Sequence, residues 1–438
     1  MKKSSFKFIL AFILLPIVVS SQDILTLEEA IRIGLENSFS IRIAKNEVDI
    51  AQNNNTIGNA GYLPRVDLNV NQNNNFQNRY FEYEDGDSNS DKGYRTHNLA
   101  SGAQLGWTLF DGFAMFIRKE KLDVFAQQSD LQLRMSIENA IANIVYTYYS
   151  IAFNENLYKS YKDQMGLSRE RLAIAREKSN IGVGYELQEL QSEVDYRADS
   201  ARYMQQSNYL TNIKAELNRL LARQPDVSFM VNTTIPVPNP EFSSDIYLKV
   251  QEQNPNMLFA RLQAKVSELE VGEAKASRYP TINLAGAYNF SRTGTPAGQT
   301  HLSQIHGPSV GVGASFTLFN GNNINRKIRN AAIIAENRKI SQEELELSLQ
   351  SRAFQMVNDL NQAIELVLVE EESVKLAQRN AEAAWEKYQL GAISDIELRE
   401  SQNKFLDAKT RLMSSQMNSQ AAALEIKTLT GDLSSFLE

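Results

Sequence analysis

The sequence contains one pattern twice, and this internal repeat limits the folds that the chain can adopt. The six residues 107–112, WTLFDG, return 209 positions later as residues 316–321, FTLFNG. The same spacing relates Gly182 to Gly391 and Tyr196 to Phe405, with no insertion between the motifs. A repeat of this length indicates a duplicated unit of about half the chain, so both halves should fold alike.

The repeat divides the chain into segments. We expect a first repeat at residues 22–223, a proline-rich linker at 224–245 and a second repeat at 246–438. The linker should be irregular, because its prolines cannot lie inside a helix. They are Pro225, Pro236, Pro238 and Pro240.

Residues 1–21 resemble a secretory signal peptide. Lys2 and Lys3 precede an apolar run from Phe8 to Val19, and small residues follow up to Ser21. This run is too short to span a bilayer as a mature helix. The sequence has no cysteine, which excludes disulfides and a lipid attached to cysteine. We therefore expect an exported protein that is cleaved after Ser21.

The net charge argues against a nucleic-acid partner. Removing residues 1–21 takes away three lysines and no acidic residue, which leaves 42 basic and 52 acidic residues. Such an acidic chain would be repelled by a phosphate backbone. Because no second apolar run of about 20 residues follows, a mature chain that crosses a membrane should do so with β-strands.

Two long stretches without proline predict the main helices. Residues 113–181 and 322–390 are uninterrupted, and at 1.5 Å per residue each would be roughly 100 Å long. Their apolar residues recur at the spacing of a coiled coil. In the first stretch these are Ile137, Ile144, Ile151, Tyr158, Met165 and Leu172, and in the second they are Leu349, Ala353, Met356, Leu360, Ala363 and Val367.

Shorter helices should flank the long ones. Residues 24–58 and 244–277 are predicted to be helical, and about 37 residues after Gly182 and after Gly391 should form return helices. Placed end to end, one helix of each kind would match the reach of a long helix.

Alternation of apolar and polar residues predicts one β-hairpin in each repeat. The first pairs a strand containing Val66 and Leu68 with one containing Leu105 and Trp107, and the second runs through residues 282–290 and 310–318. Residues 71–97 and 291–308, rich in Asn, Gly and Ser, should be exposed loops.

Two hairpins supply four strands, whereas the smallest closed membrane barrels need about eight. Several chains should therefore pool their strands. The strand face that carries aromatic residues suits lipid, and the small polar face suits a wet lumen. The expected lipid-facing aromatics and strand ends are Trp107, Phe316, Tyr288 and Phe290.

These features together resemble the TolC-type outer-membrane efflux proteins, also called outer membrane factors. The resemblance covers the signal peptide, the duplicated order of helix, hairpin and long helical pair, and the TLF-(Asp/Asn)-Gly strand ends. It implies a mainly α fold with a small β part, in which three chains share a 12-stranded barrel above a periplasmic helical tube.

The resemblance also implies a function. The chain would be the exit duct of a tripartite efflux or type I secretion system, in the outer membrane of a Gram-negative bacterium. Its partners would be two further copies, a periplasmic adaptor, an inner-membrane pump and outer-membrane lipid. Neither catalysis nor a cofactor is expected. The turns at Gly182 and Gly391 would form the tip where the pore closes.

Two acidic residues follow the second tip turn. The family pattern of an aromatic residue, a glycine and two acids is met by Tyr388, Gly391, Glu397 and Glu400. Three copies would place six carboxylates around a narrow mouth, forming a ring that favours cations. The alternative is an ordinary solvated helix face. The first turn has Gln188 and Gln191 at the matching positions, so only the second repeat would supply the ring.

Tyr388 is a candidate latch for the closed tip. Its hydroxyl would bond to a neighbouring helix, although an aromatic residue at a coiled-coil core position more commonly serves packing alone. The family often has a basic residue two positions after the second glycine, and here Ile393 occupies that place. Any lock must therefore differ in detail.

The sequence gives little support for a metal site or for catalysis. The three histidines, His97, His301 and His306, lie in predicted loops without a metal-binding spacing. An envelope hydrolase would need a catalytic constellation that we cannot assemble. The main competing function is a secreted coiled-coil scaffold that forms no channel.

Overall fold

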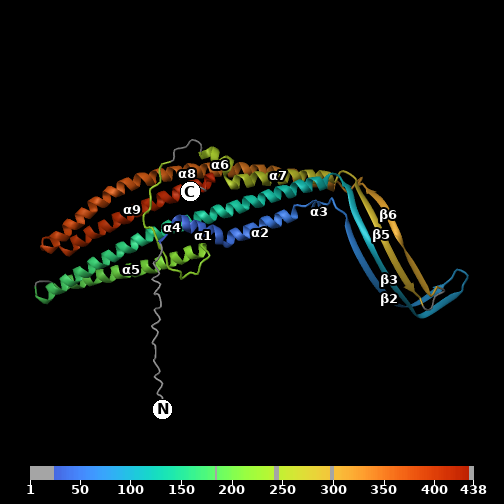
Figure 1. Cartoon of the computed structure of the whole chain (residues 1–438), viewed down its shortest axis with the longest axis horizontal. Helices are drawn as coiled ribbons and strands as arrows, with labels where there is room; N and C mark the ends of the chain where they lie inside the picture. The colour runs from blue at the N-terminus through green and yellow to red at the C-terminus, as the bar shows by residue number, and fades with distance from the viewer. Residues whose placement is uncertain (1–23, 183–184, 241–245, 296–299, 434–438) are drawn as a thin grey trace, which may run out of the picture.

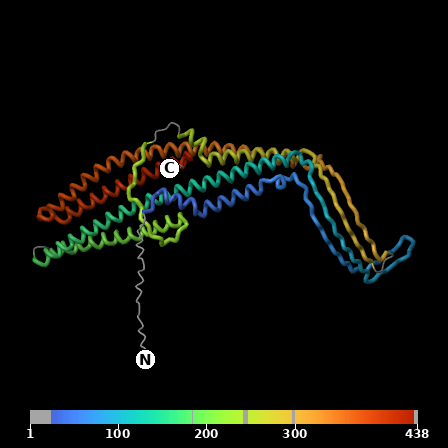
Figure 2. Tube along the Cα trace, in the orientation of Figure 1, coloured from blue at the N-terminus to red at the C-terminus, as the bar shows by residue number. Residues whose placement is uncertain are grey.

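The computed structural model describes residues 24–182, 185–240, 246–295 and 300–433. The predicted signal peptide lies outside these residues. The molecule is long and bent, with a helical arm that ends in two helical turns and a sheet at its other end (Figures 1 and 2).

The long helices form as the sequence predicts. Helix α4 spans Ala114–Asn180 and helix α8 spans Asn323–Gln389, each with 67 residues. The return helices are α5, Glu186–Leu220, and α9, Asp395–Thr430. Equivalent helices begin 209 residues apart, so the repeat seen in the sequence is a repeat of structure. No helix in the described part of the chain is long and apolar enough to cross a membrane.

The shorter helices are more broken than predicted. In the first repeat they are α1 (Leu27–Asn37), α2 (Phe39–Asn54) and α3 (Ile57–Ala60), and in the second they are α6 (Ile246–Gln253) and α7 (Pro255–Ala276). The break before α7 has a clear cause. Pro255 opens that helix, and the Asn254 side chain accepts hydrogen bonds from the backbone N–H groups of Asn256 and Met257.

Each long helix is flanked by one return helix and one series of short helices. Helix α4 packs against α5 and α1 to α3, and α8 packs against α9, α6 and α7 (Figure 1). This is the predicted arrangement. The coiled-coil positions predicted for α8, among them Ala353, Met356 and Leu360, are buried against α6 and α9.

Four antiparallel strands form the sheet in the order β2-β3-β5-β6. Strand β2 spans Arg65–Glu82, β3 spans Ser88–Asp111, β5 spans Thr281–Gly294 and β6 spans Leu302–Ser315. The central pair β3–β5 joins the two repeats. Within the described chain, β2 and β6 each have a neighbour on one side only, so the sheet has two open edges.

The prediction of long loops at residues 71–97 and 291–308 was wrong. Most of these residues lie in strands, and the first hairpin turns only between Glu82 and Ser88. Composition misled because strand propensity depends strongly on context, so pairing with β3 and β5 outweighs the general scarcity of asparagine in strands. The β2–β3 hairpin consequently extends beyond the end of β5 and β6, since Gly294 pairs with His97.

The second hairpin is shorter than the sequence predicts at the end of the sheet nearest the helices. Strand β6 stops at Ser315, which pairs with Thr281, the first residue of β5. Phe316 therefore follows the strand and is largely exposed. Since β5 starts immediately after Pro280, no partner strand remains for Phe316 or Leu318.

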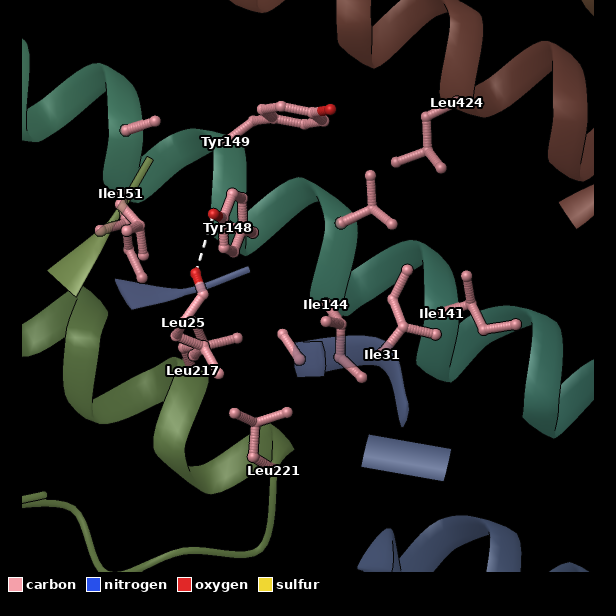
Figure 3. Packing of buried hydrophobic residues seen from close by; sticks show 14 of the residues in the cluster. Leu25, Ile31, Ile141, Ile144, Tyr148, Tyr149, Ile151, Leu217, Leu221 and Leu424 are labelled. Carbon is pink, nitrogen blue, oxygen red and sulfur yellow. Dashed lines mark hydrogen bonds between the residues drawn. The ribbon is translucent and has the colours of Figure 1, made fainter. Parts of the chain in front are cut away.

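The largest apolar core lies midway along the helical arm. It gathers residues from α1, α4, α5 and the segment before α6, including Ile31, Ile144, Leu217 and Leu221 (Figure 3). Two-residue strands β1, Ile24–Leu25, and β4, Met230–Val231, pair in parallel beside this core. The predicted linker therefore includes a short strand.

Tyr148 ties these short strands to helix α4. Its buried hydroxyl donates to the carbonyl oxygen of Leu25 at 2.9 Å (Figure 3). The same hydroxyl accepts from the Asn232 N–H at 3.2 Å. Burial raises the pKa of Tyr148, so the hydroxyl keeps its proton. This residue thus fixes the start of the described chain to the middle of the molecule.

Candidate functional site: the helical tip

Both turns at the helical tip are closed by glycine. Gly182 and Gly391 follow the long helices and have φ values of +75° and +72°, a region that favours glycine. At the second turn, the N–H of Gly391 donates to the Tyr388 carbonyl and that of Ala392 donates to the Lys387 carbonyl. This helix ending reverses the chain sharply into α9.

Glu397 stabilises the start of α9. The Glu397 carboxylate accepts hydrogen bonds from the N–H of Ser394 at 2.8 Å and from its hydroxyl at 3.0 Å. The Ser394 side chain in turn accepts from the Glu397 N–H, which completes a capping box. The hydrogen bonds from Ser394 lower the pKa of Glu397, so this carboxylate is charged at neutral pH. The role in the capping box was not anticipated from the sequence.

Glu400 lies one turn further along α9 and is well exposed. Its carboxylate contacts Lys404 at 2.7 Å on the same helix. It also lines a groove of about 400 Å³ between α5 and α9, together with Asp195, Arg399 and Asp407. Gln188 and Gln191 lie on α5, and Gln191 lines the same groove.

Tyr388 is buried at the junction of three helices. It packs in a small apolar cluster with Ala384 of α8 and Leu398 of α9, and Lys178 of α4 lies 5.1 Å from its ring centre. Burial and the nearby charge of Asp395 raise the pKa of Tyr388. The residue therefore lies where a latch would act, between the hairpin α8–α9 and helix α4.

An arginine that the sequence analysis did not single out holds the two hairpins together. Arg171 of α4 is fully buried, and its guanidinium binds both oxygens of Asp395 on α9 at 2.9 and 2.8 Å. It also donates to Asp195 of α5 at 2.8 Å. Burial alone would lower the pKa of Arg171, but the hydrogen bonds and charges of Asp395 and Asp195 outweigh it and raise this pKa.

A second arginine forms the reciprocal contact. Arg399 of α9 binds both oxygens of Asp199 on α5 at 2.6 and 2.8 Å. Asp199 is buried and also accepts from the Ser168 hydroxyl of α4. We refer to Arg171, Asp195, Asp199, Asp395 and Arg399 as the tip clamp. Two guanidiniums and three carboxylates thus cross between α4–α5 of the first repeat and α9 of the second.

The tip clamp belongs to a polar seam that the sequence does signal. Gln164, Ser168, Arg171 and Ala175 are buried at steps of four, three and four along α4. On the part of α5 nearer the tip, three buried polar residues recur every seven positions. These are Ser192, Asp199 and Gln206. Polar residues at coiled-coil spacing would have indicated this seam, but the prediction considered only the apolar positions of α4.

The strands place most of the predicted aromatics on one face of the sheet. Trp107 pairs with Leu284, while Tyr288 pairs with Ala103 and Phe290 pairs with Ser101. Paired residues share a face, so Trp107, Tyr288 and Phe290 lie on the same side, and we refer to this as the aromatic face. The Trp107 ring N–H donates to the Tyr62 carbonyl at 2.8 Å at the helical end of the sheet.

The histidines are not all in loops. His97 lies in β3 and His306 lies in β6, whereas His301 immediately precedes β6. Strand pairing explains the difference, because the predicted loops are mostly strand. Among the described residues, no group of three or more acidic, histidine or cysteine side chains could hold a metal ion.

Comparison with known proteins gives a consistent result. Residues 246–432 match the model of the outer membrane efflux protein family. The chain is 19% identical over 353 residues to the outer membrane protein TolC of Salmonella enteritidis, covering 78% of this chain and 70% of that protein. For the TolC protein of Vibrio cholerae the identity is 19% over 341 residues, covering 77% of each.

Solved structures share the fold. The Campylobacter jejuni CmeC outer membrane channel has a TM-score of 0.76 at 15% identity, with 93% of this chain and 85% of that chain covered. The open state of the Neisseria gonorrhoeae MtrE outer membrane channel has a TM-score of 0.70 at 16% identity, covering 93% and 89%. In its duplicated helices, in the four-stranded sheet that joins its two repeats and in these matches, the chain is similar to the outer membrane efflux proteins of the TolC type.

Proposed function

We propose that this protein is a subunit of a passive exit duct in the outer membrane, with its helical arm in the periplasm. Three copies form the duct, which carries substrates delivered by an inner-membrane pump through a periplasmic adaptor, in a tripartite efflux or type I secretion system. The family relationship supports this role. The duct has no catalytic task, because the pump supplies the energy.

The observation that carries the proposal is the sheet with two open edges. Strands β2 and β6 expose unpaired backbone groups along their outer sides, and such groups cannot remain unpaired in a membrane. Four strands are too few to close a barrel, whereas three copies provide twelve. Pairing of β6 in one subunit with β2 in the next removes both edges and leaves the aromatic face toward lipid.

The tip clamp holds the duct closed. Arg171 and Arg399 bind the α4–α5 hairpin to α9 through paired contacts with Asp395 and Asp199. Within the same polar seam, Gln164 Nε2 of α4 and Ser192 Oγ of α5 are buried without a hydrogen-bond partner. Water can replace such contacts more readily than it can replace apolar packing. This seam is therefore the place where the two hairpins separate when the duct opens.

The ring of Glu397 and Glu400 selects cations at the mouth. Both side chains are largely exposed in the single subunit, and Glu397 stays charged because of its hydrogen bonds to Ser394. The test is the reversal potential of purified channels across a salt gradient, with Glu397→Gln and Glu400→Gln combined. Glutamine also suits the third helical position of a capping box, so the helix start is preserved.

The ring predicts that cation preference falls in this double variant. Glu343→Gln is the matched control, because it removes a charge from α8 far from the tip. An unchanged reversal potential in the double variant would reject the ring and leave the duct intact. Tyr388→Phe tests the latch in the same recordings, since loss of its hydroxyl should raise the open fraction.

Cross-linking tests the shared barrel. The natural chain has no cysteine, so cross-links can form only between the introduced cysteines. Asn69→Cys in β2 is combined in turn with Ser303→Cys, Ser309→Cys or Gly313→Cys in β6, and a short bifunctional maleimide is added to membranes. We expect products up to a trimer and no larger. The control pairs Asn69→Cys with Asn283→Cys in the central strand β5.

Cross-links between subunits that are no stronger for the edge pairs than for the central control would contradict the barrel. Recovery of the protein as a soluble monomer, without cross-links, would favour the scaffold function instead.

A further inference from the structure

The sheet carries a compact basic patch beside its apolar band. On the aromatic face, Arg292 pairs across the ladder with Leu99 and Gln304. His97 pairs with Gly294 and His306 pairs with Phe290, each two residues from the level of Arg292. Both histidines are therefore diagonal neighbours of Arg292 on the same face, within about 8 Å by ladder geometry. We call Arg292, His97 and His306 the basic belt.

Acidic residues are absent from the strand segments around the basic belt. Residues 70–77, 95–101, 288–294 and 302–308 contain no acidic side chain, although the whole chain has a net charge of −7. The three belt side chains are exposed, and none has an ion pair among the described residues. The belt thus presents the Arg292 guanidinium and two imidazole rings outward from a protein that is otherwise acidic.

A cluster of acidic residues lies further out. The tip of the β2–β3 hairpin holds five of them and no basic residue between positions 82 and 91. They are Glu82, Glu84, Asp85, Asp87 and Asp91. From its helical end outward, the sheet therefore carries an apolar band, then the basic belt, then the acidic hairpin tip, an order that matches lipid chains, headgroup phosphates and water.

The position of the basic belt along the membrane normal also matches the level of the lipid headgroups. Trp107 marks the helical end of the apolar band and pairs with Leu284, eight residues before Arg292 on β5. Eight residues span about 27 Å of strand, and a tilt of about 40° reduces this to roughly 20 Å along the membrane normal. A transmembrane barrel has an apolar band about 25 Å tall. Arg292 therefore lies near the outer boundary of that band.

The hydrogen bonding of His97 leaves one ring nitrogen for a ligand. Its Nδ1 lies 2.7 Å from the side-chain oxygen of Asn74 on β2. Because that oxygen only accepts, Nδ1 carries a proton and Nε2 is the remaining nitrogen of the ring. The Arg292 guanidinium can donate to a phosphate oxygen, and the His97 ring lies at the next level of the ladder.

We propose that the basic belt binds the phosphate groups of anionic lipids in the outer leaflet. This inference rests on the proposed function, because it requires the aromatic face to lie against the membrane. The belt sets the depth of the barrel and retains anionic lipid around the duct.

Fluorescence quenching by brominated lipid tests the proposal. The reporter protein carries Phe290→Trp beside the belt, with both natural tryptophans changed by Trp107→Phe and Trp385→Phe. The oligomer is reconstituted in brominated phosphatidylglycerol, in brominated phosphatidylcholine and in mixtures of the two. The quenching curves give the relative binding of anionic and zwitterionic lipid next to the introduced tryptophan.

We expect the reporter protein to prefer the anionic lipid by about fivefold, the effect of one basic residue near an anionic surface. The added changes Arg292→Gln and His97→Gln should reduce the preference to near unity. Arg65→Gln is the matched control, because Arg65 is an exposed arginine at the opposite end of β2. This control should retain the preference.

Two outcomes would overturn the belt. Equal quenching by both lipids in the reporter protein means that no anionic lipid is selected, while the proposed barrel still stands. A preference that survives Arg292→Gln with His97→Gln assigns the selection to other residues. Absence of quenching by either lipid would instead show that the aromatic face does not contact the membrane, which rejects the barrel together with the belt.

Discussion

Replacing Arg171 by leucine should loosen the helical tip without disturbing the rest of the molecule. The guanidinium is fully buried, and Asp395 has only 7% of its side chain exposed. Removing the arginine leaves that carboxylate buried without its cation, a change that typically costs about 3–5 kcal/mol. Asp195 contributes less because 26% of its side chain is exposed, so the lower half of this range is the better expectation.

Hydrogen exchange followed by mass spectrometry measures this loss directly. At 1.36 kcal/mol for each factor of ten, a loss of about 3 kcal/mol raises exchange roughly a hundredfold. The increase should be confined to peptides from residues 385–402 and from the facing part of α4. Peptides around Tyr148 should keep their protection, because that core is separate from the tip.

Two further variants make the result specific. Arg197→Leu removes an exposed arginine that pairs with Glu193 on α5, and exposed pairs contribute at most about 1 kcal/mol. Adding Asp395→Asn to Arg171→Leu should restore part of the protection, since no carboxylate is then left without a cation. Protection at the tip within about threefold of wild type in Arg171→Leu, or an equal loss around Tyr148, would refute the reasoning.

Three other predictions concern single residues outside the helical tip. Tyr148→Phe should cost about 1–3 kcal/mol and increase exchange of the Asn232 amide, because the buried Leu25 carbonyl and the Asn232 N–H lose their partner; unchanged exchange would contradict it. Gly112→Ala should lower the unfolding temperature more than Gly391→Ala, although φ is positive and nearly equal at both positions, because an added methyl at Gly112 would clash with the Ala276 carbonyl oxygen while Gly391 is open. Burial raises the pKa of Glu138 above 4.5, so its ionised form is a penalty once the pH exceeds the folded pKa. Glu138→Gln should therefore raise the unfolding temperature at pH 7 and lose this advantage near pH 4, and a lower unfolding temperature at pH 7 would count against it.

The long helices were predictable because few alternatives existed. A stretch without proline, with apolar residues at coiled-coil spacing, has little choice but a long helix that needs a partner. Because the pattern returns after 209 residues, the helices predicted for the first repeat could be assigned to the second repeat as well. The sheet was predicted only in part, since asparagine-rich strands such as residues 71–75 look like loops until their ladder partners are known.

The tip clamp shows the limit of reading a single helix. Arg171 sits next to Leu172, which the apolar pattern assigned to the core, and nothing local distinguishes a buried arginine from a solvated one. Its partners Asp195 and Asp395 are 24 and 224 residues away. Glu397 was predicted from the family pattern for the pore mouth, and the capping role came to light only with the geometry of Ser394.

Planar-bilayer recording of the purified oligomer asks whether this protein forms a duct. We expect discrete, stable channels for the wild type, and a larger open fraction when Arg171→Leu breaks the tip clamp. A well-folded oligomer that produces no conductance steps, with the clamp intact or broken, would contradict the claim that this protein is a duct.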